Sequence, residues 1–182
     1  MNLINFNELN KKIQLCNECN LHKLSENQYD FDLGRGKLTI YGNGEILFLG
    51  QNPSVVRFPN CNTPCDAGVS KSFVDSVEKL GLDRGSFSFT NVVKCSTLNN
   101  LAPSLEEQQI CCQWLKLEIE LIQPRVIVAL GRVAESVVDN LNLKVKRFNI
   151  WHPSYVRRFP KYKLLYIARI KEIIKEVNDG RF

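Results

Sequence analysis

Strand-like segments that alternate with helical patterns are the feature that most constrains the fold of this chain. The strand-like segments are residues 46–49, 87–93, 126–130 and 147–150, and the helical patterns are residues 7–15, 72–80, 104–122, 132–141 and 161–177. Largely apolar runs of strand length are typical of strands that are buried on both faces of a parallel sheet. We therefore predict an α/β fold, a three-layer sandwich with a central four-stranded parallel sheet flanked by helices.

Chain length and charge set the broad class of the protein. The 182 residues fit one domain with a substantial core. No apolar run reaches the roughly 18 residues that a membrane helix needs, and the first residues lack the pattern of a signal peptide. We expect a cytoplasmic protein without membrane contact. The net charge of +5 permits a phosphate-binding face but does not require one.

Polar motifs follow three of the four predicted strands. They occupy residues 50–54, 90–95 and 152–154, with Asn52, Asn91 and His152 as their most chemically useful side chains. In parallel α/β folds, ligands collect beyond the carboxyl ends of the strands. The placement of these motifs therefore predicts a functional site at that edge of the sheet.

Cysteines form the second unusual pattern. The chain has seven, and Cys16 and Cys19 form a Cys-x-x-Cys pair after the first helix, while Cys95 follows a strand and Cys111 lies within the 104–122 helix. Disulfides are disfavoured in a reducing compartment, and four thiolates suit either zinc or a four-iron cluster. From spacing alone, zinc, an iron–sulfur cluster and buried free thiols all remain open.

Taken together, the order and spacing of these pieces resemble the uracil-DNA glycosylase superfamily, most closely its iron–sulfur branch, family 4. The resemblance runs from Cys16 to about Arg158. It rests on residues 16–21, 41–50, 90–95, 124–131 and 152–155, and on Cys111 four residues before Leu115. It implies a single uracil-DNA glycosylase-like domain over residues 1–182. It also implies that Cys16, Cys19, Cys95 and Cys111 hold a structural 4Fe-4S cluster.

The resemblance further implies an activity. The expected enzyme is a monofunctional DNA glycosylase that flips uracil out of DNA and removes it by hydrolysis in base excision repair. Asn52 would orient the water, Asn91 would read the base, and His152 would stabilise charge on the leaving base, with help from the backbone of Gln51. No lysine stands in a motif as a Schiff-base nucleophile, so lyase activity is not expected. A monomer is expected, with a sliding clamp as a further candidate partner.

Two departures from the family bear on the substrate. Asn52 replaces the Ala that is usual in the iron–sulfur branch and resembles the Asn of mismatch-directed glycosylases; an amide can orient a water but cannot take its proton at pH 7. The family's stacking Phe falls at Cys65 here, so Phe58 is the candidate to replace it against the base. Other deaminated bases are therefore further candidate substrates. The alternatives are a mismatch thymine or hypoxanthine glycosylase and a DNA-binding relative with little catalysis.

DNA contacts are expected just after His152. These residues are Ser154, Tyr155, Val156, Arg157 and Arg158. Arginines hold phosphates, and Tyr155 or Val156 would wedge into the gap that the flipped base leaves. Further candidate phosphate contacts are Lys71, Lys94, Arg132 and Lys161.

Overall fold

The sheet has five strands. The computed structural model describes residues 5–23, 39–40, 44–53 and 68–180. The strands are β1 (Thr39–Ile40), β2 (Ile46–Gly50), β3 (Phe87–Asn91), β4 (Val126–Leu130) and β5 (Lys146–Ile150), in the spatial order β1-β3-β2-β4-β5. The pairings of β3 with β2, β2 with β4, and β4 with β5 are parallel, which confirms the predicted four-stranded parallel sheet. The short β1 adds an antiparallel edge that the sequence did not predict.

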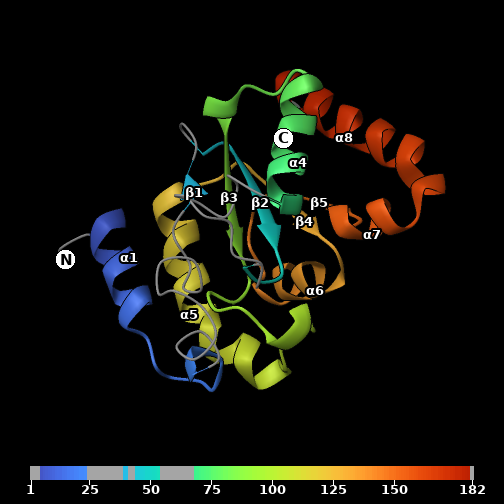
Figure 1. Cartoon of the computed structure of the whole chain (residues 1–182). Helices are drawn as coiled ribbons and strands as arrows, with labels where there is room; N and C mark the ends of the chain where they lie inside the picture. The colour runs from blue at the N-terminus through green and yellow to red at the C-terminus, as the bar shows by residue number, and fades with distance from the viewer. Residues whose placement is uncertain (1–4, 24–38, 41–43, 54–67, 181–182) are drawn as a thin grey trace.

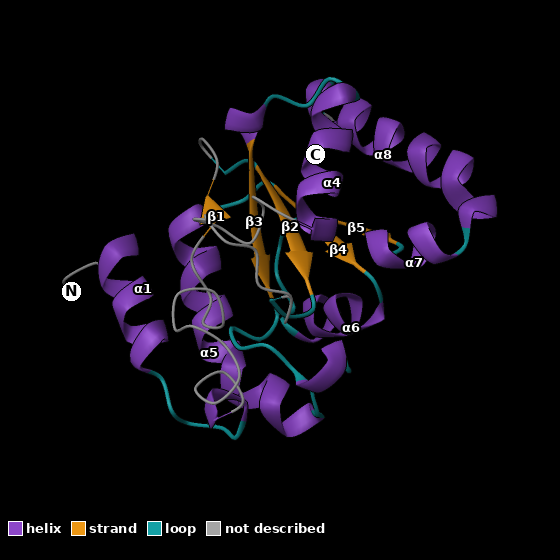
Figure 2. Ribbon diagram, viewed as in Figure 1, coloured by secondary structure: helices purple, strands orange, loops and turns teal. Residues whose placement is uncertain are grey.

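Helices cover both faces of the sheet, which confirms the predicted three layers (Figures 1 and 2). The helices are α1 (Phe6–Leu15), α4 (Gly68–Lys79), α5 (Leu105–Ile122), α6 (Arg132–Asn140), α7 (Pro153–Arg158) and α8 (Lys163–Asn178). Helices α4, α7 and α8 share one core with the sheet, and α5 and α6 share the other. Helix α1 packs on α5. None of the described helices is long and apolar enough to cross a membrane.

Alternation along β2 shows how the two cores form. Ile46 and Phe48 enter the core with α4 and α8, whereas Leu47 and Leu49 enter the core with α5 and α6. The ring of Phe48 meets that of Phe73 edge-on, with centroids 4.9 Å apart. Every residue of β2 is buried, as expected for a central parallel strand.

Local signals explain where two helices begin. Helix α5 starts with the predicted capping box: the backbone N–H of Glu107 donates to Ser104 Oγ (3.2 Å), and the Ser104 N–H donates to the Glu107 carboxylate (2.7 Å). Helix α7 was not predicted, because six residues are too few to show a helical period. It begins at Pro153, directly after His152 as its N-cap.

Candidate active site and cysteine pocket

The polar motifs lie along one edge of the sheet, at the carboxyl ends of the parallel strands (Figure 1). Gly50 at the end of β2 is in register with Asn91 at the end of β3. Leu130 at the end of β4 is in register with Ile150 at the end of β5, two residues before His152. The strand order therefore sets Asn91 and the 51–52 pair on two central strands, and His152 beyond the edge strand.

Asn91 requires the glycine beside it. The Asn91 side chain is buried, and a Cβ atom built on Gly50 would stand 2.4 Å from Asn91 Oδ1. No real Cβ tolerates such a contact, so Gly50 makes the space that the amide occupies. After the strands end, the Val92 N–H donates to the Gly50 carbonyl (2.9 Å), and the Val93 N–H donates to that of Gln51 (3.1 Å). These bonds tie the two polar motifs together.

Asn52 is held by its neighbours. Its Oδ1 accepts a hydrogen bond from Gln51 Nε2 (2.8 Å), and its Nδ2 donates to the Pro53 carbonyl (2.8 Å). Gln51 Nε2 also donates to the carbonyl of Leu101 (3.1 Å), in a loop that the sequence had not linked to this motif. A carbonyl oxygen has two lone pairs, and among the described residues only Gln51 donates to Asn52 Oδ1, so the second lone pair can accept from a water molecule.

The orientation and tautomer of His152 are fixed from one side. The backbone N–H of Ser154 donates to His152 Nδ1 (3.2 Å), and Ser154 Oγ lies 2.8 Å from the same nitrogen. An Nδ1 that accepts a hydrogen bond leaves the ring proton on Nε2. Burial, and then the charge of Arg158, lower the pKa of His152 below its ordinary value of 6.5. At pH 7 His152 is therefore a neutral imidazole with an Nε2–H donor.

Gly131 accommodates His152 at the end of β4. Its φ of +88° lies in the left-handed region, where a side chain is strained. A Cβ on Gly131 would also stand 3.3 Å from the Cβ of His152. The glycine thus allows the 131 backbone to pass close to the histidine.

The residues of α7 separate into different roles. Ser154 contacts His152, whereas Arg157 and Arg158 are exposed. Val156 is buried in the core with α4 and α8, so its expected insertion into DNA is wrong for this structure. Tyr155, half-buried beside other aromatic rings, is the one of the two wedge candidates that reaches the surface.

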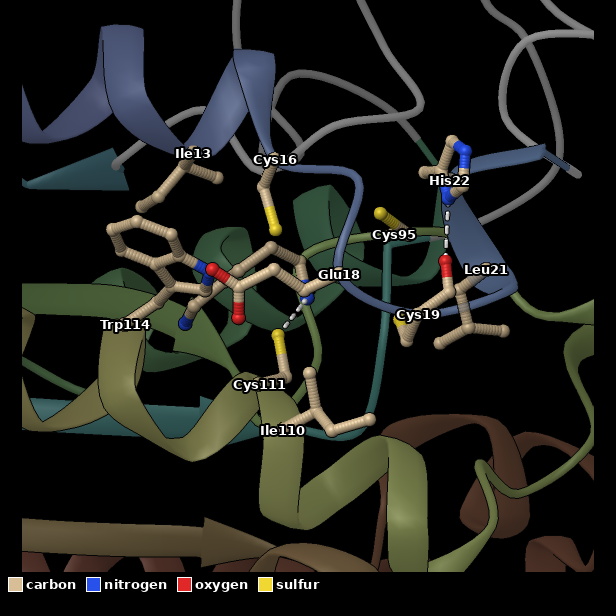
Figure 3. Close-up of a pocket in the computed structure, with 11 residues that line it drawn as sticks. Ile13, Cys16, Glu18, Cys19, Leu21, His22, Cys95, Ile110, Cys111 and Trp114 are labelled. Carbon is tan, nitrogen blue, oxygen red and sulfur yellow. Dashed lines mark hydrogen bonds between the residues drawn. The ribbon is translucent and has the colours of Figure 1, made fainter.

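The four candidate ligand cysteines surround one pocket. Cys16 caps the end of α1, Cys19 follows in the next turn, Cys95 lies four residues after β3, and Cys111 lies on α5. Figure 3 shows their sulfur atoms arranged around a common space, with Trp114 and Ile110 beside them. Cys112, although adjacent to Cys111, does not line this pocket.

The thiols of this pocket influence one another. Burial raises the pKa of Cys111 to about 12, against an opposing effect of Lys94, and neighbouring Cys95 and Cys19 raise it further. Burial also raises the pKa of Cys19, with Cys16 as a further contributor. The backbone N–H of Lys94 donates to Cys111 Sγ (3.3 Å). The donor set is therefore compact, soft and connected to the end of β3.

A buried ion pair links this pocket to Asn91, and sequence reasoning missed it. Lys94 Nζ donates to Glu118 Oε2 (2.6 Å), to Thr90 Oγ1 (3.1 Å) and to the carbonyl of Asn91. Thr90 Oγ1 in turn donates to the Glu118 carboxylate (2.7 Å). The expected phosphate contact of Lys94 is therefore wrong, because its ammonium is enclosed. The available signal was Glu118 itself, which falls on the apolar stripe of α5 with Leu115 and Ile122.

Two expected base contacts cannot be placed. Phe58 and Cys65 both belong to residues 54–67, outside the described part of the chain. The remaining wall of the site includes residues 98–100, where Asn99 and Asn100 have positive φ angles of 52° and 56°. Asn100 Oδ1 lies 3.5 Å from Asn52 Nδ2, so this turn borders the motif that carries Asn52.

Comparison with known families matches this architecture. The family model described as the uracil DNA glycosylase superfamily matches residues 40–175. The chain belongs to this superfamily. The matched region contains Asn52, Asn91 and His152 together with Cys95 and Cys111, so the superfamily assignment covers the whole sheet edge described above.

Curated members of the superfamily are similar over most of the chain. A type-4 uracil-DNA glycosylase of Archaeoglobus fulgidus is 30% identical over 90% of this chain and 88% of its own length. One from Pyrobaculum aerophilum is 28% identical over 74% of this chain and 64% of its own, and one from Thermotoga maritima is 28% identical over 82% of each. These similarities confirm the expected branch of the superfamily.

Proposed function

We propose that this chain is a monofunctional DNA glycosylase that removes uracil from DNA by direct attack of water. The observation that carries the proposal is the geometry of His152: its Nδ1 accepts from the Ser154 N–H, which leaves the Nε2–H to donate to a leaving base. His152 follows the carboxyl end of β5, and the buried Asn91 ends the parallel strand β3, so both belong to the same edge of the sheet. The type-4 uracil-DNA glycosylases among its relatives support this reading.

Recognition begins with the base outside the helix. Uracil offers a ring N–H flanked by carbonyl oxygens, and the Asn91 amide supplies the complementary donor and acceptor. Gly50 leaves the space that the Asn91 amide occupies, and Lys94 Nζ holds the backbone carbonyl of Asn91, so the residue is positioned before the base arrives. Such preorganisation directs binding energy toward the cost of flipping.

Hydrolysis then exchanges one bond for another. The water oxygen bonds to the sugar carbon C1′, the bond between C1′ and uracil N1 breaks, and its electron pair leaves with the base as an anion. The Nε2–H of His152 donates to the base oxygen that gains charge. A neutral imidazole serves here because it donates one hydrogen bond from a fixed tautomer.

Asn52 orients the attacking water through the free lone pair of Oδ1. The amide cannot accept the proton of the water at pH 7, so that proton passes to solvent as the bond forms. The rate should consequently lie below that of a relative with a carboxylate at this position. Substrate choice is part of the same question, and the other deaminated bases and mismatched thymine are outcomes of the test below.

We also propose that Cys16, Cys19, Cys95 and Cys111 hold a 4Fe-4S cluster with a structural role. Thiolates are the ligands such clusters use, and each of the four comes from the wall of one pocket. Among the described residues, no three His, Cys, Asp or Glu side chains converge closely enough to hold a single metal ion. Iron and sulfide analysis distinguishes such a cluster from a single zinc ion, which would need four sulfurs at about 2.3 Å.

Single-turnover excision tests the proposal. Anaerobically purified protein, in excess over oligonucleotides that carry U:G, U:A, T:G, hypoxanthine:T or single-stranded U, is followed by alkaline cleavage at abasic sites. We expect cutting at uracil, with a loss of about 100-fold or more in His152→Ala. The absence of cutting at every base by cluster-loaded protein would reject the enzyme and leave a DNA-binding relative. Size-exclusion chromatography of the same sample tests the proposed monomer.

A further inference from the structure

An aromatic cluster lies next to the proposed active site. The rings of Trp151, Tyr155, Phe159 and Tyr162 contact one another, with centroid separations of 6.2 Å for Trp151–Tyr155, 4.8 Å for Trp151–Tyr162, 4.7 Å for Tyr155–Phe159 and 5.8 Å for Tyr155–Tyr162. Trp151 immediately precedes His152, and Tyr155 lies one helical turn after it. The cluster is therefore continuous with the residue that stabilises the leaving base.

Part of this cluster faces solvent. Trp151 is 37% exposed and Phe159 is 43% exposed, although large aromatic side chains are usually more deeply buried. The two other rings are half-buried beneath and beside them. The two exposed rings are joined through Tyr155 into one apolar surface patch. Contiguous apolar patches that are rimmed by polar residues mark interaction sites.

Positive charge surrounds the aromatic cluster. Two arginines lie on α7, a lysine lies in the turn that follows, and another begins α8: Arg157, Arg158, Lys161 and Lys163. Within the described residues none of them forms an ion pair. Residues 140–171 contain nine of the 24 Lys and Arg residues and none of the 19 Asp and Glu residues. The segment carries +9, whereas the rest of the chain, with 15 cations and 19 carboxylates, carries −4. Three of the nine cations, Lys146, Arg147 and Arg169, pair with carboxylates just outside the segment, so the uncompensated charge beside the aromatic cluster rests on the four cations named first.

We propose that the aromatic cluster binds unpaired nucleotides of single-stranded DNA beside the base being removed. Exposed rings give stacking surfaces, and the cations beside them hold the backbone phosphates, which is the combination that single-strand binding sites use. A duplex presents its phosphates but hides the faces of its bases, so it can satisfy the cations and not the rings. The proposal deepens the proposed function, because it makes single-stranded uracil-containing DNA the favoured substrate class.

Intrinsic fluorescence tests the contact directly. The chain has two tryptophans, so Trp114→Phe leaves Trp151 as the reporter. We expect a uracil-free oligonucleotide of 15 thymidines to quench Trp151 and to bind more tightly than a 15-base-pair duplex at the same salt concentration. Phe159→Ala should weaken binding of the single strand by about 5- to 100-fold and leave duplex binding within a factor of about two. Phe159→Trp should restore single-strand affinity.

Leu164→Ala is the matched control, because Leu164 is exposed nearby but offers no ring, and it should change neither affinity. Circular dichroism melts confirm that each variant is folded. Equal single-strand affinity of Phe159→Ala and the parent protein, or equal loss for both DNAs, would overturn the proposal. Uracil-free DNA keeps this result separate from catalysis: quenching without excision rejects only the proposed enzyme, and excision without quenching rejects only the aromatic site.

Discussion

Lys94 Nζ and Glu118 Oε2 lie 2.6 Å apart, and the two side chains are only 3% and 1% exposed. The pair joins the end of β3 to the middle of α5. Lys94 stands between two proposed functions, since Asn91 precedes it by three residues and the cysteine pocket begins at Cys95, the next residue. Glu118 Oε1 has no hydrogen-bond partner within the described residues, so the carboxylate depends strongly on Lys94.

Lys94→Met should destabilise the protein by about 3–5 kcal/mol, because it leaves the Glu118 charge buried and unpaired. The double variant Lys94→Met/Glu118→Leu should regain most of that loss, since apolar groups of similar size replace the pair. Urea unfolding of Lys94→Met, Glu118→Leu and the double variant gives the coupling free energy between the two side chains. Additive effects would show that the pair does not act as one unit.

An exposed ion pair supplies the control. Lys71 and Asp75 form a salt bridge on α4 at 2.8 Å, with side chains 52% and 40% exposed. Lys71→Met should cost at most about 0.5 kcal/mol in the same measurement, because solvent screens surface pairs. A similar cost at both sites would assign the Lys94 effect to the substitution rather than to burial.

Gly50→Ala should impair excision more than folding. The added Cβ would stand 2.4 Å from Asn91 Oδ1, so the amide must move away from its position. Misplacement of about 1 Å can cost roughly 100-fold in rate. Single-turnover rates at saturating enzyme measure the effect. Gly85→Ala is the control, since its Cβ would meet nothing closer than 3.7 Å; a normal rate in Gly50→Ala would separate Asn91 from base recognition.

The excision rate should be constant from about pH 8 to 6.5 and fall below that range. The pKa of His152 is lowered from 6.5, so the imidazole stays neutral until the solution is more acidic. Protonation would add a proton at Nδ1 and break the bond from the Ser154 N–H. The unfolded chain takes up this proton first, so His152 contributes stability above pH 6.5 that is lost as the pH falls toward its folded pKa.

Arg158→Gln tests whether protonation of His152 causes the fall in excision rate at acidic pH. Removal of the Arg158 charge should raise the pKa of His152 and move the acidic limb to higher pH. With only two histidines in the chain, NMR titration of the ring protons can follow His152 directly, with His22 as the internal comparison. An unchanged pKa of His152, or an unchanged acidic limb of the pH–rate profile, would contradict the electrostatic effect of Arg158 on His152.

Adjacent cysteines should differ in their effect on the proposed cluster. Cys111 lines the pocket and Cys112 does not. Cys111→Ala should abolish the broad absorption near 400 nm of the anaerobically purified protein and lower its melting temperature, whereas Cys112→Ala should retain both. Iron and sulfide analysis gives an independent reading. Loss of iron in Cys112→Ala with retention in Cys111→Ala would reassign the fourth ligand.

The sequence predicted the sheet well because the signals were local. Residues 126–130 form a fully buried apolar run, and Ser104 with Glu107 marks the start of α5; both elements appear where they were predicted. The two-residue strand β1 and the six-residue helix α7 were missed, because neither is long enough to show a period. Short elements depend on tertiary contacts rather than on their own pattern.

Site prediction from the sequence was limited to residue identity. The strand-end motif and the family resemblance predicted a role for His152, but not that Ser154 sets its tautomer, which needs the geometry of the turn. A lysine in a loop is usually solvated, so the sequence predicts a surface cation at Lys94, and only the position of Glu118 opposite it reveals the buried pair. Val156 shows the converse error, since helix α7 turns that side chain inward.

The uneven charge of the chain has a consequence for the search for damage. Arg157, Arg158, Lys161 and Lys163 form no ion pair within the described residues, so they present uncompensated positive charge beside the aromatic cluster to a polyanion. The surface that carries these cations is attracted to nucleic acid, so encounters are oriented before any contact forms. A larger fraction of encounters then brings the binding face to the DNA. This increase in association rate should diminish as salt screens the charges.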